Sequence, residues 1–551
     1  MQLLVDLFGY LSIVLHGLTI VGQAVTLGSV LFLVFLARPH AWMMGDGGVA
    51  VIGDTTRIAR WAALGLVVGE SIVIGMQTAV LTSTTGIGLG DALGADFAIA
   101  GLAKIGATMA LFGVLMLPVS RMSSVLLVLV GTLELAAGTL TTHAVARLDD
   151  RPLLLAATAL HQFGAAIWIG GIPAFIAALK RGTDNAAWRL VGERFSTMCQ
   201  IGVVAILLSA SILATWYIGS VQAAYGTAYG VMAGAKAVMF LALLLLGYGN
   251  YRLIRGLRPH QTGSIIRVRR FAEVEIGIGF TLFFAAASLT SVPPGVDLTQ
   301  DRVTWHEIVE RNWPVSPRLV SPDHDTLTLP ALQAKLDAEA KASASKPSPA
   351  FVPGSGEIPD RNADDIAWSE YNHHWAGIFV VVIGLLAMLT QAGLRVARHW
   401  PLLFLGLAGF LFFRSDPETW PMGDISFFDS LRDVEVLQHR FFVLLLIGFA
   451  AFEWRVRAFD LRGGWMPLVF PLLTAIGAAA LLTHSHAIAN IRDQLLIEIT
   501  HTPLALAGAA AGWARWLELR LEDGRGKRVA GWIWPLCLVL VGFVLLDYRE
   551  A

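Results

Sequence analysis

The chain has 551 residues, of which 55% are hydrophobic and only 15% are charged, and its mean hydropathy is +0.64. A soluble domain carries about a quarter charged residues, so this composition excludes an ordinary soluble protein. The net charge of −1 excludes a basic nucleic-acid-binding surface, and the two cysteines, Cys199 and Cys537, exclude a disulfide framework and a C-x-x-C motif.

The chain contains fourteen apolar runs that are candidates for crossing a membrane, since a spanning helix needs about 20 mostly apolar residues. The first eight runs are at about 9–37, 61–83, 98–118, 123–142, 153–178, 199–219, 230–250 and 274–293. The last six are at about 375–393, 400–413, 438–454, 466–483, 499–514 and 531–548, and the run at 400–413 is the shortest. The sequence therefore predicts an all-α, polytopic transmembrane helix bundle in an 8 + 6 arrangement.

A long polar stretch separates the two sets of runs. It contains the Ser/Pro/Gly-rich segment SASKPSPAFVPGSGE, which is typical of a flexible tether. We expect an eight-helix membrane module at 1–295, an extracytoplasmic linker or small cap at 296–373, and a six-helix membrane module at 374–551.

The distribution of Lys and Arg among the short loops predicts the orientation. Alternate loops on one side carry 24 of these residues, and the loops on the other side carry 5. Because cytoplasmic loops are enriched in Lys and Arg, the basic side is expected to be cytoplasmic, in the inner membrane of a bacterium. Both termini and the 296–373 segment are then expected outside.

Nine of the fourteen histidines are expected at, or within about two turns of, the outer ends of helices. They are His16, His143, His161, His373, His374, His439, His484, His486 and His501. A polar group inside a spanning segment is costly and usually faces a partner or a pathway, and neutral imidazole is a common ligand for copper, zinc and haem iron. One such histidine could simply be a hydrogen-bonded interfacial residue. The whole set predicts metal binding. His373 precedes His374 in the sequence, and the eight candidate ligands are His16, His143, His161, His374, His439, His484, His486 and His501.

A short repeat supports this hypothesis. The pattern H-A-[VI]-A-x-[LI]-x-D occurs at 143–150 and at 486–493, and a histidine follows each copy, His161 after 18 residues and His501 after 15. The small residues of GAAIWIGG and ALAGAAAGW come next, and small residues allow helices to approach closely. Each module is thus expected to present two histidines to the outer side.

Charged residues within the apolar runs form a second set. Glu70, Glu134 and Glu275 are carboxylates, and Lys104 and Lys236 are candidate counterions. Buried carboxylate–lysine pairs would explain this set structurally. Alternatively, Glu70 and Glu134 are a candidate ion path toward the cytoplasm.

The stretch from His143 to Pro294 resembles the copper resistance D (CopD) family of membrane proteins. The resemblance rests on LHQFGAAIWIGGIPAF, ERFSTMCQIGVVAILLSASILATW, YGVMAGAKAVMFLALLLLGYGNYRL and EVEIGIGFTLFFAAASLTSVPPG, and more loosely on His16 in LHGLTIVGQAVTLGSVLF. It covers about the first 295 residues. It implies copper uptake or tolerance, copper as the bound ion, and delivery by a separate periplasmic copper-binding protein, since no such domain is fused to this chain.

The leading hypothesis is a copper-binding inner-membrane protein that imports or handles periplasmic copper and is not an enzyme. The chain lacks a P-loop signature, which argues against ATP hydrolysis. The alternative is a b-type cytochrome that passes electrons from quinol to a periplasmic acceptor, with haem b held by pairs such as His16/His161 or His439/His501. A third interpretation is a factor that inserts copper into an oxidase.

Overall fold

The computed structural model describes residues 8–147, 149–182, 184–257, 265–299, 302–322, 363–431, 434–461, 463–482 and 491–549. Within these ranges every regular element is a helix, and a lone bridge between Thr419 and Ile425 is the only strand-like pairing. The predicted all-α class is confirmed.

The first half of the chain forms a set of long helices with short helical pieces between them. They are α2 (Phe8–Phe32), η1 (Leu33–Ala37), α3 (Arg38–His40), η2 (Ala41–Met44), α4 (Asp46–Thr85), α5 (Leu89–Leu93), α6 (Asp96–Leu115), α7 (Arg121–Thr139), η3 (His143–Val145), α8 (Arg151–Ala165), η4 (Ala166–Gly170), α9 (Ile172–Arg181), α10 (Asn185–Tyr217), α11 (Val221–Gly226), α12 (Ala228–Arg255) and α13 (Ile266–Leu289).

The second half begins with a short helix outside the apolar runs and continues with a second set of long helices. They are α14 (Trp305–Arg311), α16 (Ala363–Gln391), η6 (Arg395–Leu402), α17 (Leu403–Arg414), α18 (Phe427–Ser430), α19 (Val434–Ala458), η7 (Met466–Leu468), α20 (Val469–Leu482), α21 (Ile491–Arg520) and α22 (Arg525–Leu546).

A helix lies at each of the fourteen predicted positions. Among the described residues, eleven helices are long and apolar enough to cross a membrane, eight in the first half and three in the second. The short run at 400–413 is one of them, because η6 and α17 extend it to Arg395–Arg414. The spans predicted at α19, α20 and α21 remain predictions, although helices occupy all three places.

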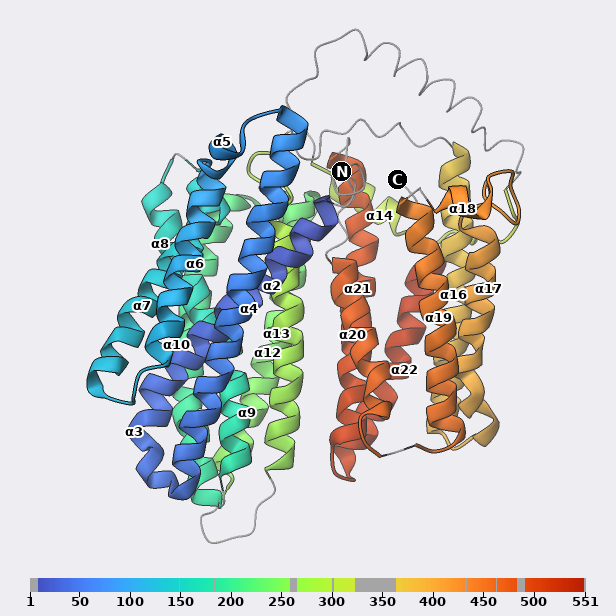
Figure 1. Ribbon diagram of the computed structural model, residues 1–551. Coiled ribbons are helices and arrows are strands. Elements are labelled where there is room, and N and C mark those ends of the chain that lie inside the picture. The colour runs from blue at the N-terminus through green and yellow to red at the C-terminus, as the bar shows by residue number, and fades with distance from the viewer. Residues whose placement is uncertain are drawn as a thin grey trace.

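The two sets of helices stand side by side as two modules, blue to green and orange to red in Figure 1. They pack directly through α12 and α13 against α20 and α21. One close approach is between Gly277 on α13 and Trp513 on α21, where a Cβ on Gly277 would lie 1.8 Å from the indole ring. Only glycine leaves room for that ring at this crossing.

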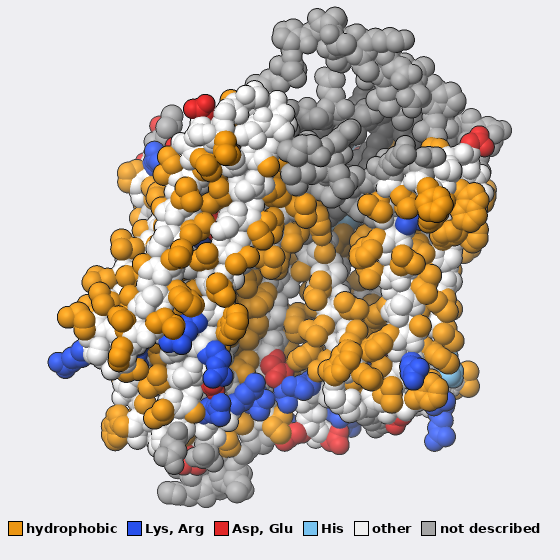
Figure 2. Space-filling view, in the orientation of Figure 1, with side chains coloured by type: hydrophobic (Ala, Val, Ile, Leu, Met, Phe, Trp, Pro, Cys, Tyr) orange, Lys and Arg blue, Asp and Glu red, His pale blue; other side chains and the backbone are white. Residues whose placement is uncertain are grey.

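The surface has the character expected of a membrane protein. Figure 2 shows apolar side chains over most of the visible flank, and most of the visible Lys and Arg side chains gather toward its lower end. The start of α2 and the end of α22 lie at the opposite end (Figure 1), which we call the outer end. This arrangement agrees with the predicted orientation, with the basic end toward the cytoplasm.

The first part of the polar segment between the modules contacts both of them, and the segment predicted as a flexible tether lies outside the described residues. In residues 302–322, Val303 N–H donates to the carbonyl of Gly226 on α11. Further along, Arg318 N–H donates to Nδ1 of His374 on α16. Helix α16 starts at Ala363, so the second module begins earlier than the predicted boundary at 374. Residues 323–362 of the predicted linker lie outside the described residues.

Candidate functional site

His161 is the best-defined histidine of the first module. It lies on α8, and its Nδ1 is 3.0 Å from Oγ of Ser209 on α10. The Ser209 hydroxyl has a single proton, and it donates that proton to the carbonyl of Ala205 at 2.7 Å. With the Ser209 proton used in this way, we assign Nδ1–H of His161 as the donor to Ser209, which makes Nε2 the unprotonated nitrogen that a metal would use.

Glycines bring these two helices close enough for that contact. A Cβ on Gly164 of α8 would lie 2.6 Å from the carbonyl oxygen of Gly202 on α10. The neighbouring Gln162 extends the polar cluster, because its Oε1 accepts a hydrogen bond from Nε2 of Gln23 on α2 at 3.3 Å. The small residues of this motif thus allow α8 and α10 to pack closely, as predicted, and this packing positions His161 beside Ser209.

His373 and His501 form the corresponding pair in the second module. His373, on α16, donates from Nδ1 to the carbonyl of Ser369 at 2.8 Å, so its Nε2 is the unprotonated nitrogen. Its ring stacks on Tyr548, with centroids 3.8 Å apart. The ring of His501, on α21, lies 6.3 Å from that of His373 and 5.7 Å from that of Tyr548.

The separation of these two imidazoles is compatible with a shared ion. Metal–nitrogen bonds are about 2 Å long, so two imidazoles that bind one ion have ring centroids roughly 5–6.5 Å apart. The observed centroid distance of 6.3 Å lies within this range. His373 and His501 come from helices more than 100 residues apart in sequence, so only the fold brings them together.

His439 is held by a carboxylate. Its Nδ1 is 2.7 Å from Oδ1 of Asp416, in the loop between α17 and α19. The adjacent Arg440 fixes that loop by donating to the carbonyl of Phe412 and to Oγ1 of Thr419, both at 2.7 Å. A histidine that donates Nδ1–H to a carboxylate has the orientation and tautomer found in many metal sites.

His374 has a different role from its neighbour. It is buried, its Nδ1 accepts from Arg318 N–H at 2.7 Å, and its Nε2 lies 2.8 Å from the carbonyl oxygen of Tyr548. Both ring nitrogens are therefore used to fasten the bridge segment and the end of α22. Coordination of a metal by His374 would require the loss of one of these bonds.

The remaining predicted ligands are less fully described. His16 lies on α2, nearer its outer end. The backbone of His143 lies in η3, and its side chain is outside the described structure. His484 and His486 fall in 483–490, outside the described residues, so the second copy of the repeat cannot be compared with the first.

The predicted ligands do not form one coordination sphere in the part of the chain that is described. No group of three or more His, Cys, Asp or Glu side chains there could hold a metal ion. The described histidines instead form local arrangements, His161 with Ser209 in the first module and His373 with His501 in the second.

The carboxylates within the first module have two distinct environments. Nζ of Lys104 lies 3.1 Å from Oε2 of Glu70, and the side chains are 1% and 7% exposed, so the predicted lysine pairing is confirmed for Glu70. Glu134 is fully buried on α7, and neither of its carboxylate oxygens has a hydrogen-bond partner in the described structure. Of the two residues of the predicted ion path, only Glu134 keeps both oxygens uncommitted.

Glu275 is satisfied by neutral donors and not by Lys236, one of the two candidate counterions. Its Oε2 accepts from Nε1 of Trp168 at 3.2 Å, and its Oε1 accepts from Nδ2 of Asn250 at 2.6 Å. Trp168 lies in the π-helix η4, a local widening of the helix that is common at functional sites. This network ties α8, η4, α12 and α13 together.

Parts of the chain are similar to known proteins. Residues 189–289 match the family described as Copper resistance protein D. The copper transport protein CutJ of Bacillus subtilis (strain 168) is 31% identical over 163 residues, which are 29% of this chain and 29% of the length of that relative. No solved structure matches the chain. The predicted resemblance is confirmed over residues 189–289, and the chain is a multi-pass bacterial membrane protein that is similar there to the copper resistance protein D family.

Proposed function

We propose that this protein binds copper on the extracytoplasmic side of the membrane and imports it, as a transporter and not as an enzyme. The family match over residues 189–289 and the partial similarity to a copper transport protein support a copper-related role. Both cover a minority of the chain, so direction and substrate rest on the arrangement of its own residues.

The observation that carries the proposal is the hydrogen bonding of three histidine rings. His161, His373 and His439 each have Nδ1 at hydrogen-bond distance from an oxygen, of Ser209, Ser369 and Asp416 respectively. Such contacts orient the imidazole ring and favour the tautomer that binds a metal through Nε2, as in many metal sites. Imidazole suits copper, and a pair such as His373 and His501 is a reasonable capture site.

The inward path is proposed to pass Glu134. Glu70 pairs directly with Lys104, whereas the carboxylate of Glu134 is buried near the same lysine and accepts no hydrogen bond in the described structure. A buried charge of this kind is costly unless a cation or proton accompanies it. Gln23 lies one helical turn nearer the outer end, against Gly138 of α7, and links this region to Gln162 and His161.

A separate periplasmic copper-binding protein is proposed as the donor. We propose that His484 and His486, which the chain carries between α20 and α21, are further copper ligands.

The test is metal content and optical spectrum of the purified full chain. We expect copper by elemental analysis and no Soret band; a stoichiometric haem without copper would replace the proposal with the b-type cytochrome. The double variant His373→Ala/His501→Ala should lower copper affinity by about one to two orders of magnitude, the effect of losing ligands or their support.

The matched control is His306→Ala. His306 lies on α14, at the outer end, with 88% of its side chain exposed, and its substitution should leave copper binding unchanged. Uptake of copper into proteoliposomes, compared between wild type and Glu134→Gln, then tests the path. Unchanged copper affinity in the double histidine variant would overturn the assignment of the capture site.

A further inference from the structure

Two cavities at the basic end of the molecule share one composition, arginine side chains beside apolar ones. The first, of about 420 Å³, lies between α3, α4 and the end of α6, and its lining includes Arg38, Thr56, Arg57, Arg60, Leu115 and Val119. The second, of about 440 Å³, is an open surface hollow whose lining side chains all belong to the first part of α22, in the other module. No Asp or Glu side chain lines either cavity.

Two of the three arginines that line the first cavity are held by uncharged acceptors. Nη2 of Arg60 donates to the carbonyl of Leu115 at 2.6 Å, and Nη1 of Arg38 donates to Oγ of Ser124 at 2.6 Å. These acceptors are uncharged, so they fix the guanidinium groups and leave their positive charge uncompensated. Arg57 is 72% exposed.

The carboxylate beside the third arginine, that of Asp54, is shared with an arginine outside the cavity. Oδ2 of Asp54 accepts from Nε of Arg181 at 2.7 Å, while its Oδ1 is 3.7 Å from Arg57. One carboxylate shared between two arginines cannot balance the three that line the cavity. The cavity therefore favours an anion, and guanidinium groups are suited to phosphate oxygens.

The apolar part of the lining indicates which class of phosphate compound the cavity suits. Leu117 and Val119, just beyond α6, are 48% and 59% exposed beside these arginines. A soluble anion gains nothing from such a wall, whereas a phospholipid presents its phosphate and its acyl chains together. Basic pockets at the cytoplasmic ends of spanning helices are known to suit anionic lipid headgroups.

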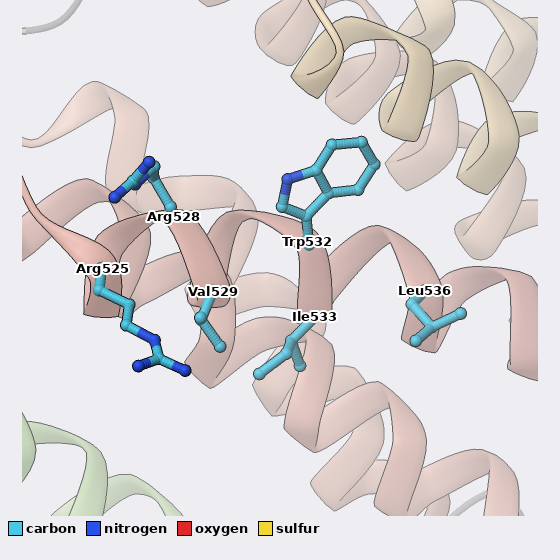
Figure 3. Close-up of a pocket in the computed structure, with 6 residues that line it drawn as sticks. All are labelled: Arg525, Arg528, Val529, Trp532, Ile533 and Leu536. Atoms are coloured by element: carbon cyan, nitrogen blue, oxygen red, sulfur yellow. The ribbon is translucent and has the colours of Figure 1, made fainter.

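The second cavity repeats this chemistry independently. Figure 3 shows Arg525 and Arg528 at one end of the α22 segment and Trp532, Ile533 and Leu536 along the rest of it. Arginines at the start of the helix are thus followed by apolar side chains further into the membrane. Trp is enriched at this depth, where its ring suits the headgroup region.

We propose that each of these two cavities binds the phosphate group of an anionic phospholipid of the cytoplasmic leaflet. The proposal does not depend on copper: it rests on the arginines, the absence of lining carboxylates and the adjoining apolar walls. Both sites would anchor the modules at the same membrane depth.

Native mass spectrometry of the full chain, released from nanodiscs, tests this directly. With phosphatidylglycerol we expect two lipids to be retained, and with phosphatidylethanolamine of the same acyl chains none. Arg57→Gln should weaken retention at the first cavity about fivefold, as expected for one cation near an anionic headgroup. Arg525→Gln/Arg528→Gln should remove the second lipid.

The control Arg252→Gln/Arg398→Gln removes two exposed basic residues outside both cavities, one from each module. It should retain both lipids. A thermal melt of each variant without added lipid checks the fold. Equal retention of the two lipids, or loss of retention in the control, would overturn the proposal. Displacement of lipid by millimolar inorganic phosphate alone would instead assign the cavities to a free anion and overturn the lipid claim.

Discussion

Nζ of Lys104 on α6 lies 3.1 Å from Oε2 of Glu70 on α4, inside the first module, with both side chains almost fully buried. This ion pair is one of two ways in which the module accommodates a buried carboxylate. The other is the set of neutral donors around Glu275. Each of these two arrangements leads to a separate prediction about the free energy of unfolding.

Removal of Lys104 should destabilise the protein strongly. Lys104→Met leaves Glu70 buried without its partner, and breaking one side of a buried pair costs about 3–5 kcal/mol. The double variant Lys104→Met/Glu70→Gln should recover most of that loss, because Glu70 is then no longer a buried charge without its counterion. Tryptophan fluorescence during unfolding in detergent measures both, and equal destabilisation of the single and double variants would contradict the pairing.

Trp168→Phe should lower the free energy of unfolding by about 1–3 kcal/mol. The substitution keeps an aromatic ring but removes the donor to Oε2 of Glu275, which leaves a buried acceptor unsatisfied. Trp216→Phe is the control, since Nε1 of Trp216 bonds to Asp150 at an exposed site. We expect less than about 1 kcal/mol there. A similar loss in both variants would show that the ring, and not the hydrogen bond, matters.

Gly170→Ala should be poorly tolerated. A Cβ at this position would lie 1.9 Å from the carbonyl oxygen of Ala24 on α2, so α2 and η4 would have to separate. Overpacking of this kind typically costs about 1–3 kcal/mol or more. Gly75→Ala on α4, where a Cβ meets no atom within 4 Å, should be neutral or stabilising by about 0.5–1 kcal/mol. Thermal melts of the two variants should shift in opposite directions.

Ser209→Ala should weaken copper binding in the first module without unfolding it. The hydroxyl holds His161 as the tautomer with Nε2 unprotonated, and loss of such a supporting contact typically costs 10–100-fold in metal affinity. Ser211→Ala removes an exposed hydroxyl two residues away on the same helix and should have no effect. Copper titration against a competing chelator distinguishes them. Identical affinities in the two variants would remove His161 from the site.

Some of the candidate site could be predicted from the sequence and some could not. The outer-end histidines and the buried acids stand out because polar residues are rare in apolar runs. Their partners do not stand out: Ser209 is one of several hydroxyls in its helix, and Tyr548 lies 175 residues after His373. In the sequence Asp416 likewise resembles an ordinary loop residue, and only the structure shows that it contacts His439.

The sequence by itself determined the all-α class, the positions of the helices and the basic side, because crossing a bilayer demands about 20 apolar residues and retains Lys and Arg on one side. These are local requirements that each segment meets alone. Only the tertiary structure decided which polar groups meet. Lys104 pairs with Glu70, while Glu134 accepts no hydrogen bond among the described residues; His374 binds backbone, while His373 faces Tyr548 and His501. Such pairings depend on helix crossings set by glycines such as Gly170 and Gly277, and a side chain's partner on another helix is not encoded in its own neighbourhood.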